Sequence, residues 1–153
     1  MKYCCTRFNT DTLYHYKKHA EHYKRVYGTP NEITQQIPPF QKITVFEMDL
    51  DTNKINGIGI IKNNPIYRKY RIYPMKYERY NRFNYEVLYY INRKVLKRQL
   101  NLSLKQLEYL LFYGKGHFKR GQGITQISRK RLPEILEILN KCKLYRHCWN
   151  YLY

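Results

Sequence analysis

Acidic residues are scarce in this chain of 153 residues. It has 11 Asp and Glu against 29 Lys and Arg, which gives a formal net charge of +18 at pH 7. The segments 52–77, 87–107 and 109–133 contain no acidic residue. Because the acids gather in the remaining segments, we expect one side of the fold to be strongly positive.

Long apolar runs and paired cysteine motifs are missing as well. No run approaches the length that crosses a bilayer, and the N-terminal MKYCCTRF has no apolar stretch of signal-peptide length. The cysteines form an adjacent pair, Cys4 and Cys5, and a spaced pair, Cys142 and Cys148, without a CxxC motif. This usage predicts neither a zinc ribbon nor a secreted disulfide framework. We expect a soluble, intracellular protein of the cytoplasm with no membrane partner.

The motifs of the common catalytic classes are not found either. There is no GxSxG, and no Cys–His pair stands in a recognisable context. Glu47, Asp49 and Asp51 alternate around a predicted hairpin turn, where a magnesium ion for nuclease chemistry is an alternative to ordinary turn acids. We expect no catalytic residue and no cofactor, so the protein is not predicted to be an enzyme.

Three histidines share one face of a predicted helix: His15, His19 and His22. Their spacing of four and three residues allows a two-histidine metal site in principle. A solvated histidine face explains them more simply, because no HExxH pattern accompanies them. We therefore expect no metal site.

Tyrosine, by contrast, is abundant, with 18 residues. In segment 62–82, KNNPIYRKYRIYPMKYERYNR, aromatic rings and cations are interleaved. Cations neutralise phosphates, and flat rings stack on bases with about 1–3 kcal/mol per base, so this segment predicts a nucleic-acid-binding surface. The alternative is that the rings fill a core and the charges are simply solvated. The predicted contacts here are Arg68, Lys69, Arg71, Tyr77 and Tyr80.

A second basic segment, GKGHFKRGQGITQI over 114–127, is rich in glycine. Glycines let a backbone approach a ligand closely, with amide hydrogens free to face a phosphate. The segment is not a Walker loop, because GK is not followed by Ser or Thr and a predicted helix precedes it. A glycine-rich turn entering a strand at Ile124 is the alternative. The predicted contacts are Lys115, His117, Lys119 and Arg120.

The hydrophobic periodicity predicts one α+β domain over 1–153, with a core over about 2–141 and a C-terminal tail over 142–153. Strands are expected over 2–8, 42–48, 55–61 and 85–95, with a hairpin turn over 49–54. A first helix is expected from Thr10 or Asp11 to about Val26. Ser103 and Gln106 predict a capping box for a second helix, and a third follows Pro133.

Five segments occur in an order that is similar to a known family: VYGTP (26–30), VFEMD (45–49), GIGII (57–61), YEVLYYINRKVL (85–96) and KRGQGITQISRKRLPEILEIL (119–139). This order resembles the YTH domain and its EVE relatives in the PUA-like superfamily, and the match covers most of the chain. The resemblance implies a small curved sheet or barrel flanked by helices. It also implies an aromatic pocket for a methylated or otherwise modified base, beside a basic groove.

By the same resemblance, Tyr27 takes the place of the first tryptophan of the aromatic cage, with Gly28 and Thr29 in the adjoining loop. Tyr77 or Tyr80 falls near the second cage position. The chain departs from the family in its only tryptophan, Trp149, which lies beyond the matching region.

The chain also resembles uncharacterised small proteins of large DNA viruses that carry a similar basic glycine loop. We expect a nucleic-acid-binding module, with RNA favoured over DNA, in a host cytoplasm or a virion. The alternative is a basic structural or packaging protein of a virion, with other viral proteins as partners. A groove that reads bases should prefer single strands or a modified base, whereas a packaging protein should bind any polyanion alike.

Overall fold

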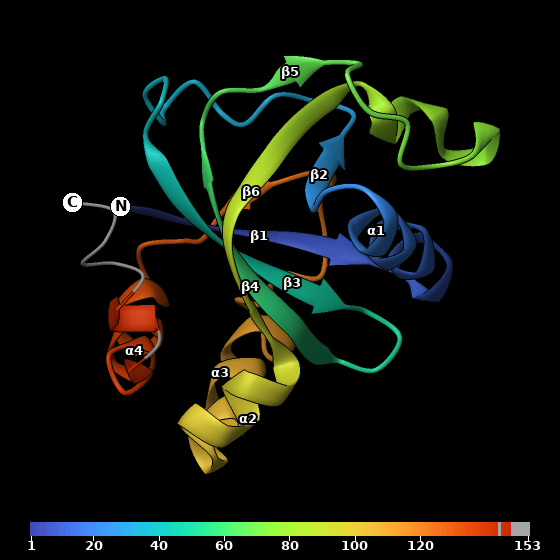
Figure 1. The fold of residues 1–153 in the computed structure, drawn as a ribbon. Helices are drawn as coiled ribbons and strands as arrows, with labels where there is room; N and C mark the ends of the chain where they lie inside the picture. Colours follow the sequence, from blue (N-terminus) through green and yellow to red (C-terminus); the bar gives the residue numbers. More distant parts are fainter. Residues whose placement is uncertain (144, 148–153) are drawn as a thin grey trace.

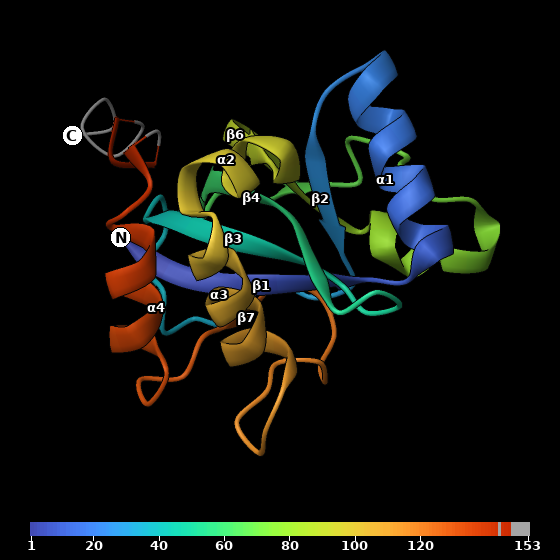
Figure 2. The same cartoon turned by 90° about the horizontal axis from the view of Figure 1, so that it is seen from below.

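The computed structural model describes residues 1–143 and 145–147; Cys148, Trp149 and the rest of the predicted tail beyond 147 lie outside the described residues. The chain forms a strongly curled mixed sheet, a half-barrel, with helices packed around it (Figure 1 and Figure 2). The strands are β1 (Lys2–Phe8), β2 (Val26–Thr29), β3 (Lys42–Asp49), β4 (Lys54–Lys62), β5 (Ile66–Tyr67), β6 (Phe83–Asn92) and β7 (Thr125–Gln126). The helices are α1 (Thr10–His22), the 3-10 helix η1 (Met75–Asn81), α2 (Arg93–Leu100), α3 (Leu102–Phe112) and α4 (Leu132–Leu139). The predicted α+β class with a small curved sheet is confirmed.

The strands follow the order β2-β6-β4-β3-β1-β7, and β5 pairs with β6 beside this path. Only β1 and β3 run parallel, with Cys4 opposite Val45, and the other recorded pairs in the described residues are antiparallel. A parallel pair requires a crossover connection, and α1 and β2 lie in it. β6 pairs with β2 and β5 near its start and with β4 near its end, so it carries the curl of the sheet (Figure 1).

The first helix differs from its prediction at both ends. Its N-cap is Asn9, whose Oδ1 accepts a hydrogen bond from the Thr12 N–H at 2.8 Å, while Thr12 Oγ1 accepts from the Asn9 N–H at 3.0 Å. This reciprocal pair is a capping box. The helix ends at His22, and Val26–Thr29 forms β2 because β6 offers it a partner strand, with Tyr27 opposite Tyr85.

The β3–β4 hairpin is confirmed, but the strand predicted over 85–95 is shifted. Strand β6 ends at Asn92, whose side chain accepts from the Val95 N–H at 3.0 Å and so caps α2, a helix that the sequence analysis missed. The predicted capping box at Ser103 does not form, because Asn101 stands at the N-cap of α3 without a side-chain bond. Pro133 lies in the first turn of α4, as predicted.

The sheet is apolar on both faces, and the period-2 alternation of strand side chains decides which residue faces which layer. Phe46 and Met48 of β3 pack with α2, α3 and α4, whereas Val45 packs with α1 and β2. Glu47 shares the side of Val45 and is fully buried. Within the described residues, no helix is both long and apolar enough to cross a membrane.

Candidate nucleic-acid interface

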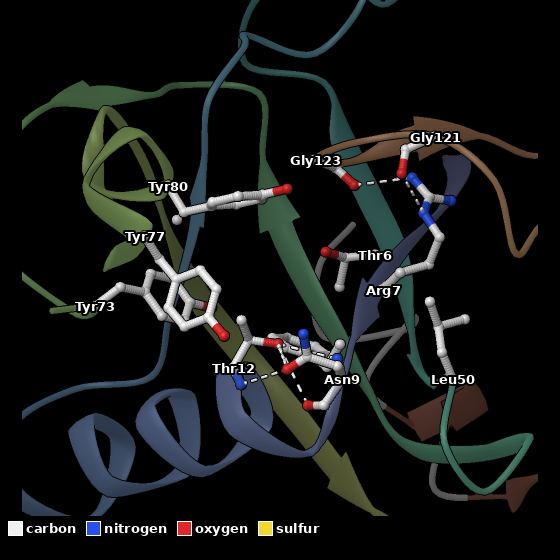
Figure 3. Close-up of a pocket in the computed structure, with 12 residues that line it drawn as sticks. Thr6, Arg7, Asn9, Thr12, Leu50, Tyr73, Tyr77, Tyr80, Gly121 and Gly123 are labelled. Carbon is white, nitrogen blue, oxygen red and sulfur yellow. Dashed lines mark hydrogen bonds between the residues drawn. The ribbon is translucent and has the colours of Figure 1, made fainter. Parts of the chain in front are cut away.

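A pocket of about 170 Å³ opens where the end of β1, the start of α1, η1 and the loop over 114–123 meet (Figure 3). We call this loop the glycine loop. Three tyrosines, here called the tyrosine wall, form one side of the pocket: Tyr73, Tyr77 and Tyr80. Gly121 and Gly123 of the glycine loop form the opposite side, and Thr6 of β1 lies between the two sides.

The tyrosine wall combines one buried ring with two partly exposed ones. Tyr73 is buried and meets Tyr77 and Tyr80 edge-on, at centroid distances of 6.4 and 6.1 Å. The hydroxyl of Tyr80 points across the opening toward Gly123 (Figure 3). The Tyr77 hydroxyl donates to Asp11 Oδ2 at 2.8 Å, and this bond, with the charge of Lys76, lowers the pKa of Asp11. The hydrogen bond thus holds the partly exposed Tyr77 ring in place, while Tyr80 is positioned by its contact with Tyr73.

Asn81 holds the segment that carries the wall. Its Oδ1 accepts from the backbone N–H groups of Ile72 and Tyr73 at 2.9 and 2.8 Å, and its Nδ2 donates to the Tyr73 carbonyl at 2.8 Å. Because Asn81 is buried, losing these bonds would leave backbone polar groups without partners. Nothing in the sequence singles out Asn81, since one asparagine among many carries no local signal.

Strand β2 contributes Gly28 to the pocket and turns its neighbours away from it. A Cβ at Gly28 would collide with the Tyr80 carbonyl oxygen, so only glycine lets β2 pass behind η1. Tyr27 is only 1 % exposed, and Thr29 is buried with its hydroxyl donating to the Asn31 carbonyl at 2.6 Å. The prediction that Tyr27 lines a base pocket is therefore wrong in this structure, because the alternation along β2 directs its ring into the core.

Arg7 of β1 fastens the glycine loop to the sheet. Its Nε and Nη2 donate to the carbonyls of Gly121 and Gly123, both at 3.1 Å, as Figure 3 shows. Its Nη1 donates to the Phe118 carbonyl and to Thr125 Oγ1, both at 3.0 Å. This role was not predicted, because its only local signal in the sequence is a lone arginine in an apolar strand.

The four predicted contacts of the glycine loop do not line the pocket, although they belong to the loop whose Gly121 and Gly123 do. Lys115 and Arg120 are exposed, whereas His117 and Lys119 are half-buried. His117 Nδ1 accepts from the Lys119 N–H at 3.1 Å. Among the described residues, no acidic side chain forms an ion pair with Lys115, Lys119 or Arg120. These cations are therefore available to a ligand anion.

A second group of tyrosines surrounds Glu47 in the core. Glu47 Oε1 accepts hydrogen bonds from the hydroxyls of Tyr16 and Tyr27, the latter at 2.9 Å. Its Oε2 accepts from the hydroxyl of Tyr90 at 2.9 Å and from Asn56 Nδ2 at 2.6 Å. We call this arrangement the Glu47 cluster. Four donors replace the water that the carboxyl group loses on burial.

Arg25 closes the Glu47 cluster on its solvent side. Its Nη1 donates to the Tyr16 hydroxyl at 2.9 Å, and its guanidinium lies 3.5 Å from the centroid of the Tyr90 ring. Burial, reinforced by the charge of Glu47, raises the pKa values of Tyr16, Tyr27 and Tyr90 well above the usual range. Burial lowers the pKa of Arg25, but the oxygens of Tyr16 and its neighbours outweigh it and raise that pKa overall.

The glycines of the GIGII segment make room for this cluster. A Cβ at Gly59 would collide with the Tyr27 hydroxyl, and one at Gly57 would collide with the Tyr90 hydroxyl. The two rings therefore cross β4 at the positions where it has no side chains. This explains, in terms of packing alone, a feature that contributed to the family resemblance.

The structure separates the three acids that were considered for magnesium. Glu47 is enclosed by its cluster, whereas Asp49 accepts from the Asp51 N–H at 3.1 Å within the turn. Asp51 Oδ2 accepts from the N–H and the hydroxyl of Thr10, each at 2.7 Å. In the part of the chain that the structure describes, no group of three His, Cys, Asp or Glu residues is placed to hold a metal ion.

Three further predicted contacts lie away from the pocket. Arg68 pairs with Glu78 at 2.8 Å, and Lys69 lies 3.8 Å from Glu86. Arg71 is exposed and lies at a shallow depression that the three histidines of α1 also line. Of the predicted contacts, the pocket brings together only Gly28, Tyr77 and Tyr80.

No family model and no curated protein sequence matches this chain. The tyrosine wall, the glycine loop and the cations beside them are thus the features from which a function is inferred.

Proposed function

We propose that this protein binds nucleic acid, with RNA as the favoured target, by accepting one base into the pocket between the tyrosine wall and the glycine loop. One observation carries the proposal: aromatic rings and the backbone of the glycine loop line one pocket, and the same loop carries exposed cations, in a chain of net charge +18. The pocket volume of about 170 Å³ is well below the roughly 300–1,000 Å³ of sites for drug-sized ligands. A single flat ring is the ligand class that suits this size.

Cations lie beside the rings that would contact the base. Lys76 Nζ lies 5.2 Å from the centroid of the Tyr77 ring, and the Arg79 guanidinium lies 5.6 Å from that of Tyr80. A strand whose base enters the pocket would bring its phosphates near these charges and near Lys119 and Arg120 of the glycine loop. Stacking and phosphate neutralisation would then act together, as in other single-strand binders.

Hydrogen-bonding groups are also placed to distinguish one base from another. Asn9 lines the pocket and uses its Oδ1 to cap α1, while its side-chain NH₂ group has no partner among the described residues. The backbone of Gly28 and the methyl groups of Leu50 add polar and apolar surface to the same pocket. We include methylated bases among the proposed ligands, because an added methyl group gains contact with aromatic and aliphatic surface.

The test is the affinity of the protein for a labelled RNA of about 16 nucleotides, measured by fluorescence anisotropy. Tyr80→Ala should weaken binding by about 5- to 150-fold, the equivalent of about 1–3 kcal/mol for one stacked base. Tyr67→Ala is the matched control, because Tyr67 is 63 % exposed and also lies beside an arginine, Arg68, but is outside the pocket. Unchanged affinity of a folded Tyr80→Ala variant would reject the pocket as the base site.

Competitors separate this proposal from the packaging alternative. An RNA with one methylated adenine, the unmodified RNA, the matching DNA and heparin should compete in decreasing order of strength. Equal competition by all four would indicate a general polyanion-binding protein. On single strands the logarithm of the affinity should fall by about 0.7 per phosphate contact for each unit of the logarithm of the salt concentration.

A further inference from the structure

A second aromatic and basic surface lies at the other end of the glycine loop. It is a depression of about 560 Å³ between the β3–β4 turn, α2 and α3. Tyr113, the C-cap of α3, lines it and directly precedes the glycine loop, whose far end lines the pocket. The glycine loop therefore connects the two sites along the chain.

Tyr109 and Tyr113 form a stacked pair in this depression. Their ring centroids are 5.7 Å apart with an interplanar angle of 17°, and the residues are 61 % and 46 % exposed. They stand four residues apart at the end of α3, so they share one face of the helix. Two exposed, nearly parallel rings leave an outer face on which a further flat ring can extend the stack.

The charges around the tyrosine pair favour an anionic ligand. Lys54, Lys97 and Lys105 line the depression, are exposed and form no ion pair with any described residue. The acid in the depression, Glu108, is already engaged, since its Oε2 accepts from Arg93 at 2.7 Å and from the Ile55 N–H at 2.6 Å. Three lysines thus remain as uncompensated positive charge beside the exposed rings.

We propose that this surface is a second subsite for the same nucleic-acid strand: the tyrosine pair stacks one base while Lys54, Lys97 and Lys105 contact the adjoining phosphates. The proposal rests on the proposed function and extends it, because a ligand that occupies both sites has to be a single strand. Bases that remain paired in a duplex cannot offer their faces to two separate sets of rings. Between the sites, the strand would follow the glycine loop past Lys115 and Arg120.

The path over the glycine loop is favoured over the alternative path across the β3–β4 turn. The connection from β3 to β4 contributes Leu50 to the pocket and Thr52 to the depression. Asp49, the last residue of β3, and Asp51 in the turn lie along this route, and their charges would repel phosphates. The cations of the glycine loop have no such acids paired with them among the described residues, so the strand gains attraction along that route.

The experiment measures how strongly the removal of one tyrosine ring weakens RNA binding at two ligand lengths. Wild type, Tyr109→Ala and Tyr80→Ala are titrated with single-stranded RNA of about 4 and about 16 nucleotides. Tyr14→Ala is the matched control, because Tyr14 is 56 % exposed on a helix and lines neither site. Circular dichroism establishes that each variant is folded.

Tyr109→Ala should weaken binding of the long RNA by about 5- to 150-fold and leave binding of the short RNA unchanged. Equal affinity of the folded Tyr109→Ala variant and wild type for the long RNA would overturn the second subsite. A loss with Tyr109→Ala but none with Tyr80→Ala would reject the pocket and retain the depression as a binding site, so the two failures are distinguishable. Binding of a duplex of equal length as tightly as the single strand would also overturn the proposal.

The double change Lys97→Ala with Lys105→Ala tests the phosphate contacts separately. For the long RNA, it should reduce the slope of log affinity against log salt concentration by about 1.4, since each phosphate contact on a single strand contributes about 0.7. The matched double change Lys17→Ala with Lys18→Ala on α1 should leave it unaltered. An unchanged slope with Lys97→Ala and Lys105→Ala would show that these lysines do not contact the strand.

Discussion

The Glu47 cluster and the tyrosine wall each use three tyrosines, in opposite ways. In the cluster the hydroxyls point inward to one buried carboxyl group. In the wall the rings meet edge-on around an open pocket, the Tyr77 hydroxyl reaches Asp11, and the Tyr80 hydroxyl points across the opening. A tyrosine has an apolar ring and a polar end, so its surroundings decide which part acts. The comparison shows that tyrosine content alone does not locate a binding surface.

The largest loss of stability is expected when the carboxyl group of Glu47 is removed from its cluster. Glu47→Ala leaves the hydroxyls of Tyr16 and Tyr27 buried without their acceptor, and we expect it to lower the free energy of unfolding by about 3–5 kcal/mol. Urea denaturation measures this loss. Glu47→Gln retains one acceptor oxygen and should lose less, which keeps the test informative if the alanine variant does not fold. A variant Glu47→Ala as stable as wild type would remove the cluster as a source of stability.

A methyl group added next to the tyrosine wall and one added next to the Glu47 cluster should have different effects on RNA binding. Gly28→Ala collides with the Tyr80 carbonyl behind the wall, and Gly59→Ala collides with the Tyr27 hydroxyl in the cluster. Overpacking of this kind costs about 1–3 kcal/mol, so both variants should be less stable in thermal denaturation. At a temperature where both are folded, only Gly28→Ala should also weaken RNA binding. Equal weakening by both would mean that the wall and the cluster are coupled.

The dependence of stability on alkaline pH should reveal the buried tyrosine hydroxyls of the Glu47 cluster. The hydroxyl of Tyr27 in the unfolded chain ionises near pH 10, whereas burial and Glu47 raise its pKa in the folded protein. Above about pH 10 the unfolded chain therefore binds fewer protons, and stability falls by about 1.4 kcal/mol per pH unit for each such tyrosine. Tyr27→Phe should reduce this slope by that amount.

Below about pH 9 the stabilities of wild type and Tyr27→Phe should differ by a constant amount, because neither state loses the proton there. This range is the internal control of the titration, measured by urea denaturation at each pH. Parallel stability curves at higher pH would contradict a buried, protonated Tyr27 hydroxyl.

The smallest effect is expected from Tyr77→Phe. This change removes the hydrogen bond to the exposed Asp11 but keeps the ring, so stability should fall by no more than about 1 kcal/mol. RNA affinity should change by less than about 0.5 kcal/mol, because the ring makes the proposed contact. A loss of affinity as large as that of Tyr80→Ala would show that the wall acts through its hydroxyls and would erase its difference from the Glu47 cluster.

Elements with a complete local signal could be predicted, and elements that depend on a distant partner could not. The β3–β4 hairpin has alternating apolar residues on both sides of a turn. Helix α4 has a proline in its first turn, where proline is favoured. The first helix was predicted to run to about Val26, but it ends at His22, and Val26–Thr29 forms β2 because β6 pairs with it. The strand predicted over 85–95 likewise ends early, at Asn92, because the Asn92 side chain caps α2.

The residues of the candidate site likewise include some that the sequence predicted and some that depend on distant partners. Gly28, Tyr77 and Tyr80 were predicted to belong to one site, and they line one pocket. Arg7 was missed, because its role depends on the glycine loop, which lies more than a hundred residues further along the chain. Tyr27 was expected to line the pocket from a loop after the first helix, but it lies in β2, where its register with β6 turns its ring into the core.

Composition and local pattern by themselves determined the net positive charge, the many tyrosines, the basic glycine loop and the α+β class. The tertiary structure alone decided which tyrosines surround Glu47 and which form the wall of a pocket. Charge and helix or strand periodicity are properties of neighbouring residues, so a sequence displays them directly. Burial is a property of the surrounding fold, and an aromatic ring with a hydroxyl is compatible with both a core and a surface until that fold is known.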